Sequence, residues 1–270
     1  MKTILLHIAD EASLPTRLET ALAIARPMGA HLRCLQVTPI ESYVAMDSLG
    51  GVFVMSDLLK AVEEQESALK AQVEEELSNE DVTYDFRHTT GAVPGAVASY
   101  AALADLVVSG REAKETQRGA FAAGLADIVE QSRTPVLVCG DGVFDPFAPA
   151  MVAWNGSFEA AAALKGALPL LQKSASVHVV SAADEADRAG TFPPTLVLEY
   201  LSRYGIKAEL RTPVIERHRI ANALLGEAEA IGAGLIVMGA YGHSRIGEYL
   251  LGGVTRTMLA ACKLPLLMAR

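Results

Sequence analysis

Short, continuously apolar runs alternate with longer stretches of helical periodicity along the whole chain. The apolar runs have the length of buried strands and lie near residues 3–9, 31–38, 82–88, 105–109, 135–139, 150–155, 176–182, 206–212, 234–239 and 264–269. Helical stretches between them include Leu14–Pro27, Ser56–Leu77 and Ile220–Ile231. Strands without polar alternation, separated by helices, are typical of parallel sheets covered on both faces. The pattern therefore predicts an α/β protein with doubly wound parallel sheets.

The two halves of the chain repeat this order of elements. Asp105–Gly110 (DLVVSG) matches Gly234–Gly239 (GLIVMG), and Thr134–Val138 (TPVLV) matches Leu264–Met268 (LPLLM), at offsets of 129 and 130 residues. The first strands are offset by about 148 residues, so the first copy carries roughly 20 extra residues around Ile40–Lys60, by hand alignment. The chain is therefore predicted to hold two tandem domains, each with a five-stranded sheet.

A linker is predicted between the copies. Residues 140–149 contain two glycines and two prolines and show no periodicity. We therefore predict an N-terminal domain over residues 1–142 and a C-terminal domain over residues 149–270. Within the extra segment, Tyr43–Met55 is rich in methionine, glycine and apolar residues. It is either a loop folded over its own domain or a cover for a domain or subunit interface.

The charge of the chain limits its classes of binding partner, and its cysteines indicate its redox environment. The net charge is −9, from 23 basic and 32 acidic residues, and no basic stripe is present. Such a chain is a poor ligand for nucleic acids and membrane surfaces. Cys34, Cys139 and Cys262 are widely spaced without a CxxC pair, which predicts reduced thiols. With neither a secretion signal nor a membrane-length apolar run in view, we expect a cytoplasmic protein that binds neither nucleic acid nor membrane.

The strongest candidate site follows the fourth strand of the second copy. Four glycines mark the end of that strand and the start of the last helix: Gly239, Gly242, Gly252 and Gly253. Glycine lets backbone amides approach an anion closely, and a helix start adds unpaired N–H groups and its dipole. This spacing, with His243 and Arg245 nearby, predicts a phosphate site. The alternative is a set of glycines that only form turns.

Other phosphate, catalytic and metal motifs are missing from the sequence. The run from Gly247 to Gly252 resembles the start of a Walker loop, but Gly253 stands where lysine is required. The sequence around Ser244 lacks the second glycine of a hydrolase elbow. Neither an HExxH motif nor a paired-cysteine site occurs. We therefore predict no catalytic and no metal-binding residue.

On these residues the chain resembles the universal stress protein family in its tandem two-domain form. The most specific element is the family's Gly-x2-Gly-x9-Gly-(Ser/Thr) signature, matched by Gly239, Gly242 and Gly252. The resemblance implies two Rossmann-like domains of the adenine-nucleotide alpha hydrolase type and an ATP site, with or without Mg²⁺, in the C-terminal copy. Gly253 replaces the family's Ser or Thr, although its backbone N–H is retained and Thr255 lies two residues on.

The resemblance also implies where the rest of the nucleotide lies. The family has an aspartate at the end of the first strand, where this chain has Asn155 followed by Gly156. Asparagine offers both a donor and an acceptor to adenine or ribose. Val180, at the end of the second strand, is expected to pack on the base, and Val254 continues the phosphate-binding helix start. Glu216–His218 replaces a glycine of the family's third loop.

The N-terminal copy is expected to have lost its site. Gly110 is followed by Arg111, and the downstream segment Ala122–Leu125 keeps one glycine, Gly124, before Asp127. A carboxylate in the first turn of the helix would repel a phosphate group. This copy is therefore predicted to have a degenerate nucleotide loop and to bind no ATP.

The resemblance finally suggests an arrangement and a function. Because the final strands of two domains pair in the family, Pro135–Cys139 and Pro265–Ala269 are expected to pair within this chain as an internal pseudo-dimer, with further homo-oligomerisation left open. We predict an ATP-binding stress-response protein that acts through ligand-dependent contacts with protein partners not identified by the sequence. A ligand-free interaction module and a slow ATPase are the alternatives. Glu248 is the only carboxylate in the glycine loop, so at most weak hydrolysis is expected.

Overall fold

The computed structural model describes residues 1–9, 12–39, 44–46, 52–54, 56–110, 121–181, 192–214, 219–240 and 253–270. Five strands of the N-terminal half belong to its main sheet: β1 (Thr3–Ile8), β2 (His31–Thr38), β5 (Tyr84–Thr90), β6 (Leu106–Ser109) and β7 (Val136–Val138). The C-terminal half contributes β8 (Ala150–Trp154), β9 (Val177–Ser181), β10 (Ala208–Arg211), β11 (Leu235–Gly239) and β12 (Leu266–Ala269). Together they form one ten-stranded sheet in the order β10-β9-β8-β11-β12-β7-β6-β1-β2-β5.

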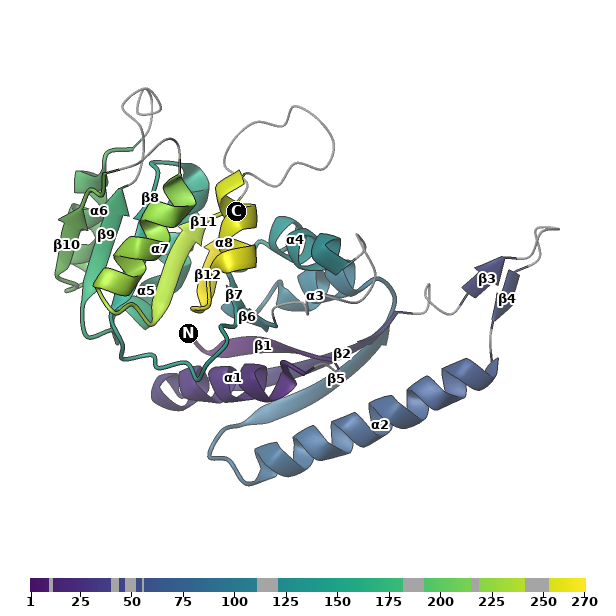
Figure 1. Cartoon of the computed structure of the whole chain (residues 1–270). Coiled ribbons are helices and arrows are strands. Elements are labelled where there is room, and N and C mark those ends of the chain that lie inside the picture. The colour runs from purple at the N-terminus through teal and green to yellow at the C-terminus, as the bar shows by residue number, and fades with distance from the viewer. Residues whose placement is uncertain are drawn as a thin grey trace.

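Helices cover both faces of this sheet (Figure 1). The N-terminal half has α1 (Leu14–Met28), α2 (Ser56–Ser78), α3 (Val93–Ala101) and α4 (Phe121–Gln131). The C-terminal half has α5 (Phe158–Leu171), α6 (Pro194–Arg203), α7 (Ile220–Ala230) and α8 (Gly253–Ala261). Buried residues form two clusters, one beneath α1, α2, α5 and α6 and the other beneath α3, α4, α7 and α8. The inner strands are mainly apolar because neighbouring positions face opposite clusters, whereas the edge strands β5 and β10 carry polar residues.

The first helix shows how local sequence sets the element boundaries. Leu14, Leu18 and Leu22 recur at helical spacing and bury one face of α1 against the sheet. The helix ends at Gly29, which has a φ of 55°. The N–H of Ala30 then donates to the carbonyl of Ala25 at 3.0 Å, which closes the helix end as in a Schellman motif. Such endings return the chain directly into the next strand.

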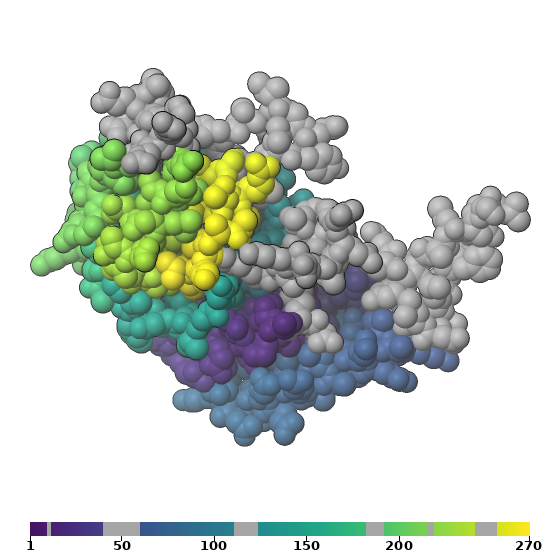
Figure 2. All heavy atoms as spheres, in the orientation of Figure 1, coloured from purple at the N-terminus to yellow at the C-terminus, as the bar shows by residue number. Residues whose placement is uncertain are grey.

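The two halves join through their last strands. β7 and β12 pair antiparallel, with Leu137 opposite Leu267, whereas the other strand pairs of the ten-stranded sheet are parallel. The expected internal pseudo-dimer pairing is therefore confirmed. Gly166 of α5 packs so closely on Pro135 that an added Cβ would lie 2.2 Å from the proline Cγ. The atoms of the two halves accordingly lie in direct contact in Figure 2.

The extra N-terminal segment is partly strand, which the sequence did not predict. β3 (Val44–Met46) and β4 (Val52–Val54) pair antiparallel as a separate two-stranded sheet. Figure 1 shows this hairpin beyond the N-terminal end of α2 and away from the ten-stranded sheet. The expectation of a loop folded over its own domain is therefore wrong for these six residues. Strands of three residues are too short to show a period of two. The interface hypothesis stays a prediction.

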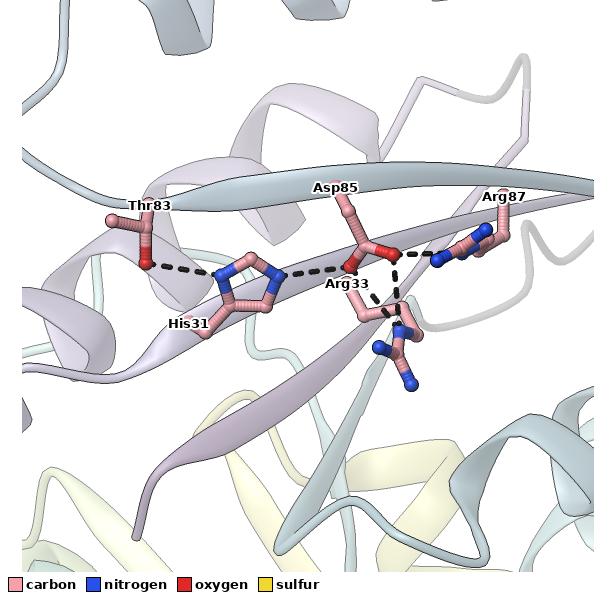
Figure 3. Close-up of polar contacts among 5 residues, drawn as sticks. All are labelled: His31, Arg33, Thr83, Asp85 and Arg87. Atoms are coloured by element: carbon pink, nitrogen blue, oxygen red, sulfur yellow. Dashed lines mark hydrogen bonds and ion pairs between the residues drawn. The ribbon is translucent and has the colours of Figure 1, made fainter.

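A polar cluster ties the edge strand β5 to β2 (Figure 3). Asp85 accepts hydrogen bonds from His31 Nε2 at 2.9 Å, from Arg33 Nε at 3.2 Å and from Arg87 Nε at 2.7 Å. The second ring nitrogen of His31 lies 3.0 Å from Thr83 Oγ1. Partial burial alone would raise the pKa of Asp85, but these hydrogen bonds and the Arg33 charge hold it below its ordinary value. The cluster therefore stabilises the sheet edge in its ionised form.

Across the described part of the chain, no helix has both the length and the apolar character needed to cross a membrane.

Candidate functional site

The candidate site lies at the carboxyl edge of the C-terminal half-sheet. β8 pairs with β9 on one side and with β11 on the other, all parallel. The strand order therefore changes direction at β8, and ligands of open α/β sheets bind at such a switch point. α8 returns the chain from the end of β11 to the start of β12, so its N-terminus is expected at the same edge. The structure thus brings the strand-end and helix-start candidates to one side of the sheet.

Asn155 shapes the turn that follows β8. Its Oδ1 accepts a hydrogen bond from the N–H of Ser157 at 3.2 Å, and Gly156 adopts a φ of 78°. Ser157 Oγ in turn accepts from the N–H of Ala160 at 3.1 Å and caps α5. An aspartate would make the same turn, so the change to asparagine keeps the backbone and removes a charge. Asn155 itself is exposed at the edge of the sheet.

Two phenylalanines beside this turn were not singled out from the sequence. Phe158 opens α5, and its ring lies 5.2 Å from the ring of Phe192 in an edge-to-face arrangement. The N–H of Phe192 donates to the Gly156 carbonyl at 3.1 Å, and its own carbonyl accepts from Trp154 Nε1 at 2.9 Å. These bonds hold residue 192 over the end of β8, although it is distant in sequence.

Gly239, at the end of β11, is fixed by packing. A Cβ added there would lie 2.4 Å from the backbone nitrogen of Ala160 and 2.7 Å from the carbonyl carbon of Glu159. The start of α5 therefore contacts the end of β11 through backbone atoms alone. Gly239 would be required for this contact with or without a ligand. This supports a structural role for one of the four glycines.

The start of α8 divides its residues between core and surface. Gly253 is exposed, and a Cβ added there would meet no atom of the described residues within 4 Å. Val254 packs partly against the second core cluster, and Thr255 is buried. A buried Thr255 leaves the missing hydroxyl at position 253 unreplaced. Backbone N–H groups of the first turn are therefore the donors that this helix offers.

The remaining predicted residues divide into two groups. Val180 is fully buried in the second core cluster, so in this conformation its side chain lies behind the edge rather than open to a ligand. Four candidates lie outside the described residues: Gly242, His243, Arg245 and Gly252. The same holds for Glu216–His218 and for Arg111. Among the described residues, no group of three or more His, Cys, Asp or Glu side chains could hold a metal ion.

A buried arginine fills the corresponding edge of the N-terminal half. Arg17 of α1 donates to the carbonyl of His7 at 3.1 Å and to that of Ala9 at 3.2 Å, at the end of β1. A Cβ on Gly110 would lie 2.6 Å from Ser13 Oγ and 3.1 Å from Arg17 Cδ. Counted from the serine that precedes each helix, Ala161 is the residue of α5 that corresponds to Arg17. The two halves therefore differ where a ligand would enter.

His7 makes the N-terminal half sensitive to acid. Burial and then the nearby Arg17 charge lower the pKa of His7 from 6.5 to about 4. Between these values the unfolded chain binds a proton that the folded chain does not, so the free energy of unfolding falls as pH falls. We expect a loss of between about 1 and 2 kcal/mol from pH 6.5 to pH 5, because the slope approaches its full value of about 1.36 kcal/mol per pH unit only below pH 6.5. Urea unfolding at several pH values, with His7→Leu as the control that lacks this slope, measures it. Equal slopes in both proteins would contradict the assignment.

The chain was compared with known proteins. Residues 146–270 match the Universal stress protein family. A universal stress protein from Archaeoglobus fulgidus DSM 4304 is 16% identical, with a TM-score of 0.74 over 99% of this chain and 98% of that chain. A protein of unknown function from Pseudomonas aeruginosa PAO1 is 15% identical, with a TM-score of 0.62 over 100% of this chain and 92% of that one. These likenesses show the fold of both halves. No curated protein sequence matches the chain.

Proposed function

We propose, from the match of residues 146–270 to the universal stress protein family, that this chain is a stress-response protein with one ATP site in its C-terminal domain. The observation that carries the proposal is the open start of α8. Among the described residues, no atom lies within 4 Å of a Cβ built on Gly253, and this supports an anion approaching the first-turn N–H groups. The positive end of the helix dipole favours negative charge at the same place.

The candidate residues receive roles from their positions. We assign Asn155 and Gly156 to the nucleoside end, since both lie in the turn after β8. We assign the phosphates to the backbone of Gly253 and of three glycines before it, Gly239, Gly242 and Gly252, with His243 and Arg245 as nearby cations. Val180, Val254 and Thr255 anchor the surrounding backbone in the core. Mg²⁺ would be held by the nucleotide's own phosphates.

The N-terminal domain binds no nucleotide in this proposal. Arg17 donates to two strand-end carbonyls at the edge where a nucleotide would lie. A guanidinium already bonded there leaves less room for a ligand than Ala161 does in the other half. We therefore assign residues 1–142 to a ligand-free domain and residues 149–270 to the nucleotide-binding domain. The ligand would act by stabilising α8 and the glycine loop before it, and so change contacts with protein partners.

The single tryptophan provides the test. Trp154 directly precedes Asn155 and is the only tryptophan in the chain, so its fluorescence reports on this edge alone. We expect adenine nucleotide among the small molecules released from the purified protein, detected by mass spectrometry. We also expect a saturable change of Trp154 fluorescence on ATP addition, with one equivalent bound per chain.

Three outcomes separate the alternatives. No released nucleotide and no saturable binding of ATP would favour the ligand-free interaction module. Two equivalents of ATP per chain would place a site in the N-terminal domain as well. Steady release of phosphate from excess ATP and Mg²⁺, above the rate without protein, would favour the slow ATPase.

A further inference from the structure

The exposed aromatic pair at the carboxyl edge of β8 has no packing role that explains its exposure. Phe158 is 76% exposed and Phe192 is 40% exposed, yet the two rings contact each other edge to face. Large apolar side chains in contact at a surface, next to a polar candidate residue such as Asn155, are typical of a ligand site. The pair is adjacent to Asn155 and Gly156 through the turn that both phenylalanines border.

The N-terminal half provides an internal comparison. Leu14 follows Ser13 at the start of α1, as Phe158 follows Ser157 at the start of α5. Leu14 is only 6% exposed, because it packs into the first core cluster. At the same position, therefore, the side chain is buried in the core in the N-terminal half and exposed to solvent in the C-terminal half. The half that exposes an aromatic ring is the half that retains the glycine signature.

The position of Phe192 is set by its backbone. Its N–H donates to the Gly156 carbonyl and its carbonyl accepts from the Trp154 indole. These two bonds place its ring against Phe158 without using any atom of the ring itself. The rings are thus held in place and remain available for a further contact. Aromatic faces and edges of this kind bind planar heteroaromatic groups by stacking.

We propose that Phe158 and Phe192 form the base-binding wall of the C-terminal site and hold a nucleotide by stacking on its base. This inference rests on the proposed function and adds which part of the nucleotide the site recognises. Val180 is buried and so leaves the base without its expected partner on that side. Every nucleobase has a stacking face, so a wall of this kind distinguishes bases weakly. The site therefore selects a nucleoside triphosphate over triphosphate alone, with little preference between adenine and guanine.

Phenylalanine-to-leucine variants test the wall without disturbing the turn. Phe158→Leu and Phe192→Leu remove the flat ring and retain an apolar side chain and both backbone hydrogen bonds. Phe147→Leu is the matched control. Phe147 is also exposed, at 53%, but it belongs to the linker segment, residues 140–149, that joins the two halves in sequence. Titration calorimetry measures the binding of ATP, GTP and inorganic tripolyphosphate to each variant. Thermal melts confirm that each variant is folded.

The expected pattern distinguishes stacking from phosphate binding. ATP and GTP should each bind about 10- to 100-fold more weakly to the double variant Phe158→Leu/Phe192→Leu, the loss expected for base stacking. Tripolyphosphate binding and the Phe147→Leu control should be unchanged. Unchanged ATP affinity in the folded double variant overturns the wall and leaves the proposed function standing. A strong preference of the wild type for ATP over GTP also overturns it. Absence of ATP binding to the wild type overturns both proposals.

Discussion

Gly239→Ala is expected to destabilise the protein by about 3 kcal/mol or more, at the upper end of what overpacking costs. The added methyl would lie 2.4 Å from the backbone nitrogen of Ala160. Backbone atoms cannot rotate aside, so α5 must shift away from β11 to admit it. α5 also packs against Pro135 of the other half, so the shift extends across the joint between halves.

Gly110→Ala is the matched comparison. Gly110 directly follows β6, at the position that corresponds to Gly239 in β11, but its added Cβ would meet side-chain atoms, Ser13 Oγ and Arg17 Cδ. Side chains can change rotamer, so this substitution should cost about 1 kcal/mol. Urea unfolding of both variants measures the difference. If both variants lost the same free energy of unfolding, α5 would move as easily as the side chains of Ser13 and Arg17. That result would contradict the expectation based on the backbone contact of Gly239.

The glycine signature illustrates what sequence can and cannot predict about a site. From the sequence, the four glycines formed one pattern to which a single role, phosphate binding, was assigned. In the structure two of them differ: Gly239 is required by its backbone contact with α5, whereas no described residue lies within 4 Å of a Cβ built on Gly253. A glycine needed for packing says nothing about a ligand. Position 253 is therefore the more informative one, although it is the one that departs from the family signature.

The fold was predictable because its parallel strands are buried on both faces. Such strands are apolar runs, and their repetition at nearly constant offset shows two copies without any knowledge of contacts. Even the pairing of β7 with β12, expected from the family resemblance, is confirmed. The β3–β4 hairpin was missed because three-residue strands carry too little pattern. The fold could therefore be predicted from the sequence because its strands are buried within the chain.

The site residues that sequence missed depend on contacts between distant segments. Phe192 reaches Phe158 only because the Trp154 indole and the Gly156 carbonyl hold its backbone. Nothing in the local sequence around residue 192 signals these bonds. Arg17 likewise resembles an ordinary exposed cation on a helix, yet it is buried beneath Gly110. Helical periodicity locates a side chain on a face of its helix and does not show what lies beyond that face.

Gly253→Asp is expected to abolish most nucleotide binding while leaving the fold intact. A Cβ at this position meets no described residue within 4 Å, so the substitution should leave the packing of α8 undisturbed. A carboxylate in the first turn interacts favourably with the helix dipole, by about 0.3–1 kcal/mol, so the melting temperature should not fall. The same charge opposes the phosphates, and we expect ATP affinity to drop about 100-fold, which corresponds to about 2.7 kcal/mol.

Gly253→Ser adds an uncharged side chain at the same position. Serine is smaller than aspartate, carries no charge and restores the hydroxyl that the family signature has at this point. Because the position is open, the variant should fold like the wild type and bind ATP as tightly or about threefold more tightly, within the range of one added hydrogen bond. Calorimetric titrations of the two variants with ATP, each paired with a thermal melt, provide the comparison. If the aspartate variant binds ATP as well as the serine variant does, the phosphates do not lie at the start of α8. Loss of binding in the aspartate variant alone, with melting temperature unchanged, places the phosphates there.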